Sequence, residues 1–355
     1  MAMTEVFVGA GLLRRLPGLL NSRVPRRRVS IVVDAALGGA GRRLAGAFRA
    51  AGWKAPLAFL PAGEAAKSLR SLAALYDFLL TSGHERRDAV LALGGGTVGD
   101  AAGFAAATFM RGVPLVQVPT TLLAQSDSCL GGKTGVNLPG AKNAVGAFHQ
   151  PLLVAADTDF LKTLPERDFR SGLAEVVKYG LVLDAAFARE LAKRWDLLAR
   201  RQPAALAWAV GRSLRIKASI VAQDERDLSG RRELLNFGHT LGHALESAGG
   251  FSRYRHGEAV AFGMRAAALI SLGRGGLADG ADARLVWDLL GRLPAVRVAP
   301  GIRGRALIRA LSHDKKARGG RPVFVLLKGL ARPERSGAVT EAQVLRALAS
   351  LGVRP

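Results

Sequence analysis

The sequence predicts an α/β domain with a doubly wound parallel sheet, followed by a mainly helical domain. Short apolar runs alternate with amphipathic segments in the first half of the chain, which is typical of parallel strands joined by crossover helices. In the second half almost every apolar pattern has helical spacing. A turn around Pro165 separates the two regions, so we expect domains at residues 1–165 and 166–355.

The first domain contains five apolar runs of strand length. They predict strands at residues 29–33, 55–60, 89–93, 114–118 and 151–157. Apolar residues at helical spacing predict three helices between them, at residues 38–52, 67–80 and 98–110. In the second domain we expect helices throughout, including residues 273–309, apart from one strand at 322–328 and a last helix at 341–351.

Length and composition limit the class of protein. The chain has 355 residues, of which 49% are hydrophobic, so it can bury a large core and is not expected to be disordered. Its single cysteine, Cys129, excludes an internal disulfide framework and suits a reducing compartment. We find no secretory signal and no uncharged apolar run of the ~18 residues that a membrane span needs. We therefore expect a cytoplasmic protein without a membrane partner.

The net charge of +23 could attract nucleic acid, acidic membranes or phosphorylated small molecules. The basic residues are scattered along the whole chain, with only short clusters such as Arg26-Arg27-Arg28. Aromatic residues make up 6% of the chain and do not alternate with basic ones, as a nucleic-acid surface would favour. We therefore interpret most of the charge as solvated surface that helps to attract anionic substrates, and we expect no nucleic-acid partner.

A glycine-rich turn follows the third predicted strand, in the sequence Gly94-Gly95-Gly96-Thr97-Val98-Gly99-Asp100. Glycines between a strand and a helix let the backbone approach a pyrophosphate, and the helix N-terminus supplies N–H donors. The spacing differs from GxGxxG, so this would be a variant of the dinucleotide-binding turn. The alternative is a tight turn that needs positive φ angles.

Two threonines, Thr120 and Thr121, follow the fourth predicted strand, where side chains of a parallel sheet face the ligand crevice. The Gly-rich loop after them carries polar groups that suit a polyhydroxylated phosphate: Asp127, Lys133, Lys142 and Asn143. The alternative is a surface loop with solvated lysines.

The stretch from Leu235 to Met264 contains three of the six histidines. His239 and His243 are four residues apart, so they share one face of a helix, and His256 opens a second helical pattern. Imidazoles together with a carboxylate are the ligands that zinc needs, and a catalytic zinc keeps one position open. The alternative is a set of polar side chains on a solvated helix face.

The mostly apolar helical segment Gly172–Gly180 contains a carboxylate and an ammonium, Glu175 and Lys178, three residues apart. Such groups are costly on a buried helix unless they are paired or bind an ion. Glu175 is therefore our candidate for the carboxylate ligand. The alternative is one salt bridge on a solvated face.

Nine motifs occur in one order from about Gly63 to Lys328: GGGTVGD, FMRGV, QVPTTLLAQSDS, GGKTGVN, GAKNAVGAF, FLKTLP, GLAEVVKYG, NFGHTLGHALE and HGEAVAFGM. On these motifs together, the chain resembles the 3-dehydroquinate synthase family of sugar-phosphate cyclases. The resemblance implies an NAD-binding α/β domain, a helical zinc- and substrate-binding domain and a site in the cleft. It also implies conversion of 3-deoxy-D-arabino-heptulosonate 7-phosphate to 3-dehydroquinate and phosphate, in the shikimate pathway.

The resemblance also assigns roles to residues. The family's zinc ligands fall on Glu175, His239 and His256, which Co²⁺ could also occupy, and His243 becomes a substrate-facing or proton-handling group instead of a ligand. The positions that match NAD contacts, the first two more loosely, are Glu64, Lys67, Gly94, Gly95, Gly96, Gly99, Asp100, Thr120, Thr121, Lys133, Lys142, Phe160 and Thr163. The positions that match the substrate site are Asp127, Lys133, Asn143, Lys178, Lys217, Arg232, Asn236, His243 and one of Lys315 and Lys316.

An arginine of the neighbouring subunit reaches the substrate phosphate in this family, and Arg111 stands at that position, which implies a homodimer. Arg232 with Lys217 would bind the substrate carboxylate. The chain departs from the family pattern at Cys129, usually a serine, and at Ser126, usually aliphatic. One extra residue lies before Arg232, and the first sixty residues match only in pattern. None of these departures removes a functional group.

Two rival functions share the fold. Another sugar-phosphate cyclase would act on a sedoheptulose or hexose phosphate; such relatives lack the substrate carboxylate and usually change the residues that bind it. Those residues are all present here, namely Lys217, Arg232, Asn236 and His243. A metal-dependent polyol dehydrogenase would release NADH and would not need so many phosphate-binding lysines.

Overall fold

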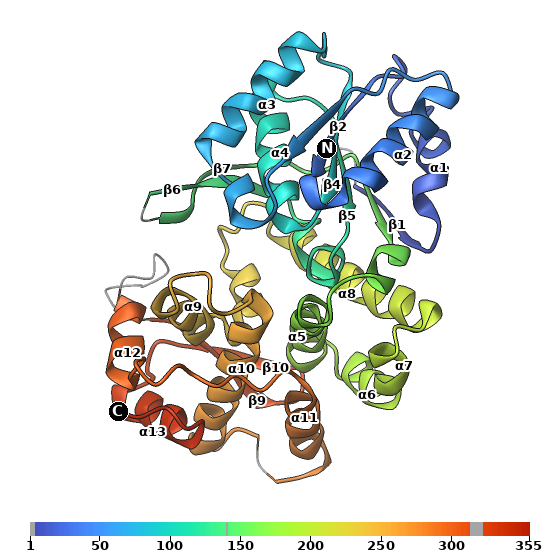
Figure 1. The fold of residues 1–355 in the computed structure, drawn as a ribbon. Coiled ribbons are helices and arrows are strands. Elements are labelled where there is room, and N and C mark those ends of the chain that lie inside the picture. The colour runs from blue at the N-terminus through green and yellow to red at the C-terminus, as the bar shows by residue number, and fades with distance from the viewer. Residues whose placement is uncertain (1–3, 140, 278, 313–321) are drawn as a thin grey trace. The chain divides into compact units, whose positions relative to one another are not determined.

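The computed structural model describes residues 4–139, 141–277, 279–312 and 322–355. The chain forms two compact units (Figure 1). The first comprises Met1–Leu164 and Arg201–Ala218, and the second comprises Pro165–Arg200 and Ser219–Pro355. With a single boundary at residue 165, we expected Arg201–Ala218 to belong to the second domain. In the structure this segment packs in the first unit instead. One reason is a polar contact between distant parts of the chain, since Lys217 pairs with Asp127 at 2.7 Å.

The first unit is built on a six-stranded sheet with the order β1-β8-β5-β4-β2-β3, in which all neighbouring strands are parallel. The strands are β1 (Glu5–Gly9), β2 (Val29–Asp34), β3 (Leu57–Leu60), β4 (Ala89–Gly94), β5 (Leu115–Pro119) and β8 (Leu153–Asp157). The five predicted strands are thus confirmed, with ends shifted by one or two residues. Strand β1 was not predicted, because this short edge strand is half exposed and lacks a continuous apolar run.

Helices cover both faces of this sheet, as a doubly wound sheet requires (Figure 1). Helices α1 (Leu12–Leu20) and α2 (Gly38–Ala50) pack on one face against strand residues such as Ile31. Helices α3 (Leu69–Thr81) and α4 (Gly96–Thr108) pack on the other face against strand residues such as Val32. Because consecutive strand residues point to opposite faces, each apolar run supplies two cores.

A two-stranded antiparallel hairpin replaces the loop that we expected after Asp127. Its strands are β6 (Lys133–Leu138) and β7 (Ala141–Phe148), and it packs against α4. At the contact, a Cβ on Gly103 of α4 would lie 2.5 Å from the Thr134 side chain, so glycine is needed there. The sequence prediction was wrong here because glycines and lysines hide the strand pattern.

The second unit is mainly helical, as predicted. Its helices are α5 (Glu166–Leu183), α6 (Ala185–Lys193), α7 (Trp195–Ala199), α9 (His239–Ala248), α10 (His256–Gly273), α11 (Ala281–Arg292), α12 (Gly304–Ser312) and α13 (Glu341–Ser350). Helix α8 (Pro203–Gln223) begins in the first unit and ends in the second. The helical region expected at 273–309 is two helices instead, because Pro294 and Pro300 interrupt it. The expected strand at 322–328 is β9 (Phe324–Gly329), which pairs with β10 (Arg332–Ser336).

Close backbone contacts bring α5, α9 and α10 together in the second unit. A Cβ on Gly257, in the first turn of α10, would lie 1.8 Å from the Ser171 carbonyl oxygen of α5. A Cβ on Gly263 would lie 1.8 Å from the Gly238 carbonyl oxygen, just before α9. These glycines have no side chain, so the three backbones approach more closely than any other residue would allow. The first turns of α9 and α10 are thereby held beside the middle of α5.

No helix in the described part of the chain is long and apolar enough to cross a membrane.

Candidate functional site

Three side chains that the sequence singled out meet in the second unit. Glu175 lies on α5, His239 is the first residue of α9, and His256 is the first residue of α10. The Oε1 atom of Glu175 lies 3.5 Å from Nε2 of His239 and 3.4 Å from Nε2 of His256. One ligand atom from each residue falls within 4.8 Å of the other two, so the three could hold one metal ion.

Glu175 is fully buried, yet its Oε1 atom has no hydrogen-bond partner among the described residues. A buried carboxylate oxygen without a partner is costly, and an ion bound beside it would remove that cost. Two imidazoles and a carboxylate are also a ligand set that zinc accepts. The residues present therefore fit a divalent metal ion.

The Lys178 ammonium, also buried, forms an ion pair with the other carboxylate oxygen of Glu175. Burial opposes ionisation of Glu175, but Lys178, His239 and His256 outweigh it and hold the pKa of Glu175 well below its ordinary value. Burial and the Lys178 charge lower the pKa of His239 well below its ordinary value, so this ring keeps a lone pair for a metal. The solvated-surface alternative for Glu175 and Lys178 is therefore wrong.

His243 lies one turn after His239 on α9, with the two ring centroids 5.4 Å apart, and both rings lie beside His256. It lies with Glu246 and His256 in a second group whose ligand atoms are within 4.8 Å of one another. The ring centroids of His243 and His256 are 6.1 Å apart. Burial of His256 is outweighed by Glu175 and Glu246, which together raise the pKa of His256 to about 10.

The 3₁₀ segment η6 (Arg231–Asn236) leads into α9 and carries two of the expected substrate residues. Arg232 is 5% exposed, whereas its neighbour Arg231 is exposed. The Arg232 guanidinium donates a hydrogen bond to the Glu225 carbonyl at 3.0 Å. Asn236 is the last residue of η6 and is partly buried. The two arginines therefore differ in environment although the sequence shows no difference between them.

In the first unit, the glycine-rich turn joins β4 to α4. Gly94 ends the strand, Gly95 precedes the helix and Gly96 begins it, and no side chain caps that N-terminus within the described residues. Its backbone N–H groups can therefore take an anion. None of Gly94, Gly95, Gly96 and Gly99 is among the positive-φ glycines, so the tight-turn alternative does not explain them.

Close packing explains two of these glycines instead. A Cβ on Gly96 would lie 2.8 Å from the Ser128 hydroxyl, and one on Gly99 would lie 2.8 Å from the Gln117 side chain. Thr120 and Thr121 follow β5, which pairs with β4, and the Thr120 amide donates to the Gly94 carbonyl at 3.0 Å. The threonines and the glycine turn are thus neighbours at the carboxyl edge of the sheet, as predicted.

Polar contacts beside this turn involve five of the expected residues. The Lys67 ammonium lies 2.6 Å from Asp100 on α4 and also donates to the side chain of Asn143 on β7. Burial raises the pKa of Asp100, and Lys67 partly offsets the effect. Lys142 lies 3.4 Å from Glu64. Glu64 and Lys67 match the family's NAD-binding positions more loosely than the others. In the structure, Lys67 contacts Asp100 and Asn143, and Glu64 contacts Lys142.

Asn137, which was not among the predicted site residues, joins this network to the hairpin. Its side chain donates to Glu64 at 2.7 Å and accepts from the Asn143 amide at 2.9 Å. Asn143 has a φ of +51°, a conformation that asparagine tolerates better than most residues. The GGKTGVN motif contains Asn137, so an asparagine at a strand end next to predicted site residues was the available signal.

A second ion pair lies next to a single π-helical turn, η4 (Ala124–Ser128). The Lys217 ammonium, 6% exposed, donates to both the carbonyl and the carboxylate of Asp127 at 2.7 Å. Lys133 begins β6 and is exposed. Cys129 and Ser126, the two departures from the family pattern, are buried nearby, and burial raises the pKa of the Cys129 thiol to about 12. A thiol with so high a pKa is inert, which agrees with a packing role.

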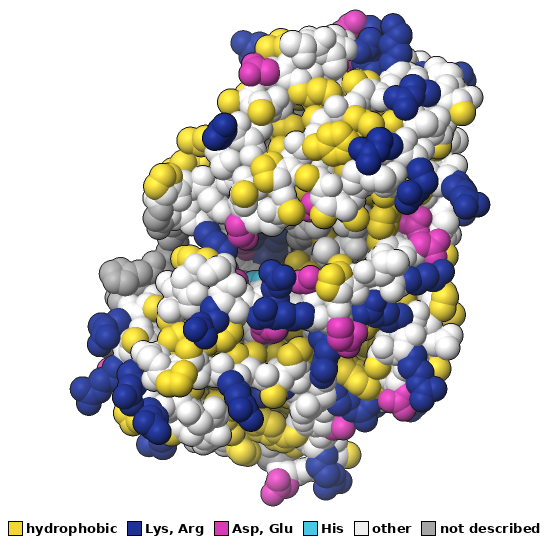
Figure 2. Space-filling view, in the orientation of Figure 1, with side chains coloured by type: hydrophobic (Ala, Val, Ile, Leu, Met, Phe, Trp, Pro, Cys, Tyr) yellow, Lys and Arg dark blue, Asp and Glu magenta, His cyan; other side chains and the backbone are white. Residues whose placement is uncertain are grey.

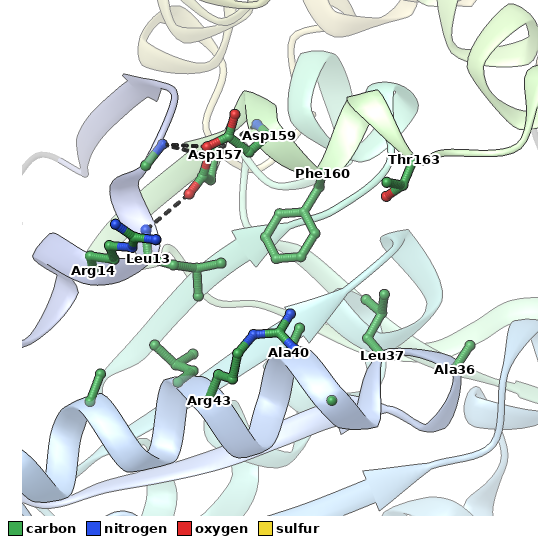
Figure 3. A pocket seen from close by; sticks show the side chains of 14 residues that line it. Leu13, Arg14, Ala36, Leu37, Ala40, Arg43, Asp157, Asp159, Phe160 and Thr163 are labelled. Atoms are coloured by element: carbon green, nitrogen blue, oxygen red, sulfur yellow. Dashed lines mark hydrogen bonds between the residues drawn. The ribbon is translucent and has the colours of Figure 1, made fainter.

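Phe160 and Thr163 line a cavity of about 670 Å³ in the first unit (Figure 3). Figure 3 shows Phe160 and Arg43 projecting into it from opposite sides, with Leu37 beside them. Residues just after β2 and β8 line this cavity. Because β2 pairs in parallel with β4, the cavity lies at the carboxyl ends of the strands, on the same side as the glycine turn. No sequence motif marks the cavity residues on α1 and α2.

Arg111 lies just after α4 and is exposed. It and Met110 both have positive φ angles, 65° and 48°. Such a conformation costs on the order of 1–3 kcal/mol for each non-glycine residue, so the surrounding fold holds this turn in a strained form. The expected substrate residues Lys315 and Lys316 lie outside the described residues.

The basic side chains do not gather in one stripe. Figure 2 shows Lys and Arg scattered over the face in view, with hydrophobic and acidic side chains between them. This distribution agrees with a solvated charge and gives no sign of a nucleic-acid surface on that face.

Two family models match the chain along most of its length. The model described as 3-dehydroquinate synthase N-terminal matches residues 57–171, and the one described as 3-dehydroquinate synthase C-terminal matches residues 172–317. The chain belongs to the 3-dehydroquinate synthase family. Glu175, His239, His256 and Arg232 all lie in the region matched by the C-terminal model.

Curated relatives agree with this family. The 3-dehydroquinate synthase of Symbiobacterium thermophilum is 47% identical over 318 residues, covering 89% of this chain and 88% of the relative. The 3-dehydroquinate synthase of Desulforamulus reducens is 41% identical over 345 residues, covering 97% and 96%.

Solved structures of sugar-phosphate cyclases share the fold. The 2-epi-5-epi-valiolone synthase of Streptomyces hygroscopicus, with NAD⁺ and Zn²⁺ bound, is 31% identical with a TM-score of 0.89 and covers 99% of this chain and 97% of its own. A 2-deoxy-scyllo-inosose synthase complexed with carbaglucose-6-phosphate, NAD⁺ and Co²⁺ is 28% identical with a TM-score of 0.86 and covers 97% and 96%.

Proposed function

We propose that this member of the 3-dehydroquinate synthase family converts 3-deoxy-D-arabino-heptulosonate 7-phosphate to 3-dehydroquinate and phosphate. The enzyme would be a carbon–oxygen lyase of aromatic amino acid biosynthesis, acting in the cytoplasm. The observation that carries the proposal is the set formed by the buried Glu175 with His239 and His256, which occurs together with the family's glycine turn and basic residues. NAD and one zinc or cobalt ion are the proposed cofactors, as in the two solved cyclases.

NAD is proposed to lie along the carboxyl edge of the first unit's sheet. The backbone N–H groups at the start of α4 would bind its pyrophosphate. The cavity that Phe160 and Thr163 line is large enough for its adenosine part. Lys67, Asp100 and Asn143 hold one another in place beside the turn and would orient the rest of the cofactor.

When bound, NAD takes up and returns one hydride, and the metal ion lowers the pKa of the substrate hydroxyl that is oxidised. Glu175, His239 and His256 would hold that ion. Lys178, already paired with Glu175, keeps that carboxylate ionised at the site. His243, on the same face of α9, would hold or move a proton.

The oxidised carbon makes the neighbouring C–H acidic, so that phosphate can leave by elimination. Basic side chains such as Lys133 are proposed to bind the phosphate and stabilise the charge that develops on it. Return of the hydride to the substrate, ring opening and an intramolecular aldol addition would then complete the carbocycle. Arg232 with Lys217 would bind the substrate carboxylate, since a guanidinium offers two parallel donors to it.

Turnover with the heptulosonate phosphate, NAD and Zn²⁺ tests this function. We expect phosphate release to require NAD, while absorbance at the NADH band stays flat, because the hydride is returned in each cycle. One NADH per substrate would instead favour the polyol dehydrogenase. Equal or faster phosphate release from sedoheptulose 7-phosphate, which lacks the carboxylate, would favour another sugar-phosphate cyclase.

A homodimer is also proposed, with Arg111 acting on the phosphate bound by the neighbouring subunit. Its exposure and strained turn support a role outside its own packing. The inactive variants Arg111→Ala and His256→Ala, mixed and allowed to exchange subunits, should regain up to about one quarter of wild-type activity. The reason is that half of the dimers are then mixed and each has one complete site. If the exchanged mixture stays as inactive as the separate variants, Arg111 does not act across an interface.

A further inference from the structure

The two nitrogens of the His256 ring contact two different carboxylates. Its Nε2 atom lies 3.4 Å from Glu175 Oε1, on the proposed metal side, and its Nδ1 atom lies 3.3 Å from Glu246 Oε2. Glu246 comes from α9, whereas His256 begins α10 and Glu175 lies on α5. One ring is therefore held between carboxylates of two other helices.

The position of Glu246 is unfavourable for an isolated carboxylate. It lies in the last turn of α9, where the helix dipole disfavours negative charge, and its side chain is only 12% exposed. Its backbone carbonyl accepts a hydrogen bond from Phe251 at 2.8 Å, but any residue could supply that carbonyl. The contact between its carboxylate and Nδ1 of His256 offsets that unfavourable position.

His239 shows the same arrangement with a different acceptor. Its Nε2 atom lies 3.5 Å from Glu175 Oε1, and its Nδ1 atom lies 3.3 Å from the Phe237 carbonyl oxygen. Both rings thus present Nε2 to Glu175 and have an acceptor behind Nδ1. An acceptor at Nδ1 keeps a proton on that nitrogen, so Nε2 is the nitrogen that gives up its proton to bind a metal ion.

We infer that Glu246 is a positioning residue, which orients His256 through Nδ1 and, by its charge, strengthens Nε2 as a metal ligand. This inference rests on the metal site of the proposed function. It differs from a direct ligand role, which the grouping of Glu246 with His243 and His256 would also allow.

The test compares full-length wild type with Glu246→Ala, Glu246→Gln and Ser247→Ala, an exposed neighbour on the same helix. Zinc affinity is measured by competition with a chromophoric chelator, and Co²⁺ loading gives the stoichiometry and the ligand-field spectrum. We expect one ion in every protein and an affinity about 10- to 100-fold weaker in Glu246→Ala. Glu246→Gln should lose less, because the amide oxygen still accepts from Nδ1, and Ser247→Ala should match wild type.

Three results would overturn the inference. Unchanged zinc affinity in both Glu246 variants would mean that the contact orients nothing. A change in the cobalt band intensity of Glu246→Gln would mean a lost direct ligand, and a second ion in wild type that Glu246→Gln lacks would mean a separate cation site. Circular dichroism checks folding, and Glu246→Gln decides the matter if the alanine variant does not fold. If wild type binds neither Zn²⁺ nor Co²⁺, the proposed metal site itself is wrong. If wild type and the Glu246 variants bind the metal equally well, the metal site stands and only the role of Glu246 is wrong.

Discussion

Replacing Glu175 by glutamine is expected to abolish metal binding and to destabilise the second unit strongly. The substitution keeps the size of the side chain but removes the negative charge next to Lys178, which is 2% exposed. Removing one partner of a buried ion pair lowers the free energy of unfolding by about 3–5 kcal/mol, because the remaining charge stays buried without compensation. The free energy of unfolding from urea titration and the zinc content should both fall.

A double variant separates the two effects. In Glu175→Gln/Lys178→Met the uncompensated ammonium is gone, so most of the lost stability should return while zinc binding and activity stay absent. Glu190→Gln is the matched control, since Glu190 pairs with Lys193 at the same i,i+3 spacing on an exposed helix face. That variant should unfold like wild type. Normal zinc content in Glu175→Gln would remove Glu175 from the ligand set.

Replacing Arg232 by lysine is expected to lower kcat/KM by roughly 30- to 1000-fold, equivalent to about 2–4 kcal/mol. Arginine can pair with a carboxylate through two parallel hydrogen bonds, whereas lysine offers a single point charge. Because Arg232 is 5% exposed, solvent cannot replace the lost contact. Steady-state kinetics with the heptulosonate phosphate measure the effect.

Arg231→Lys is the control for that variant. Arg231 is the preceding residue and is exposed, so the same change should leave kcat/KM almost unaltered. If Arg232→Lys is as active as Arg231→Lys, the carboxylate assignment is wrong. The case for the heptulosonate phosphate as substrate, over the substrate of another sugar-phosphate cyclase, would then also be weaker.

Features that depend on near neighbours in the chain could be predicted from the sequence. The apolar runs of β2, β4, β5 and β8 predicted buried parallel strands, because a strand buried on both faces needs apolar residues at every position. The glycine turn before α4 was predicted for a similar reason, since a strand, several glycines and a helix follow one another directly. The candidate metal ligands came from residue type and spacing together with the family motifs.

Contacts between distant segments were decided only by the tertiary structure. Glu175 meets His239 and His256 because Gly257 and Gly263 let three helices approach closely, and no local pattern shows which glycines are opposed. The hairpin β6–β7 and the packing of Lys217 in the first unit depend on partners far along the chain in the same way.

The clearest cases are neighbouring residues of the same or similar chemistry. Arg231 and Arg232 are identical in type, and His239 and His243 share a helix face, so spacing alone cannot assign them different roles. Burial separates the arginines, and the side chains opposite each ring separate the histidines, which places His239 beside Glu175 and His243 in a group with Glu246 and His256. Burial and charge at a site are sums over all segments packed around it, and only the folded chain brings those segments together.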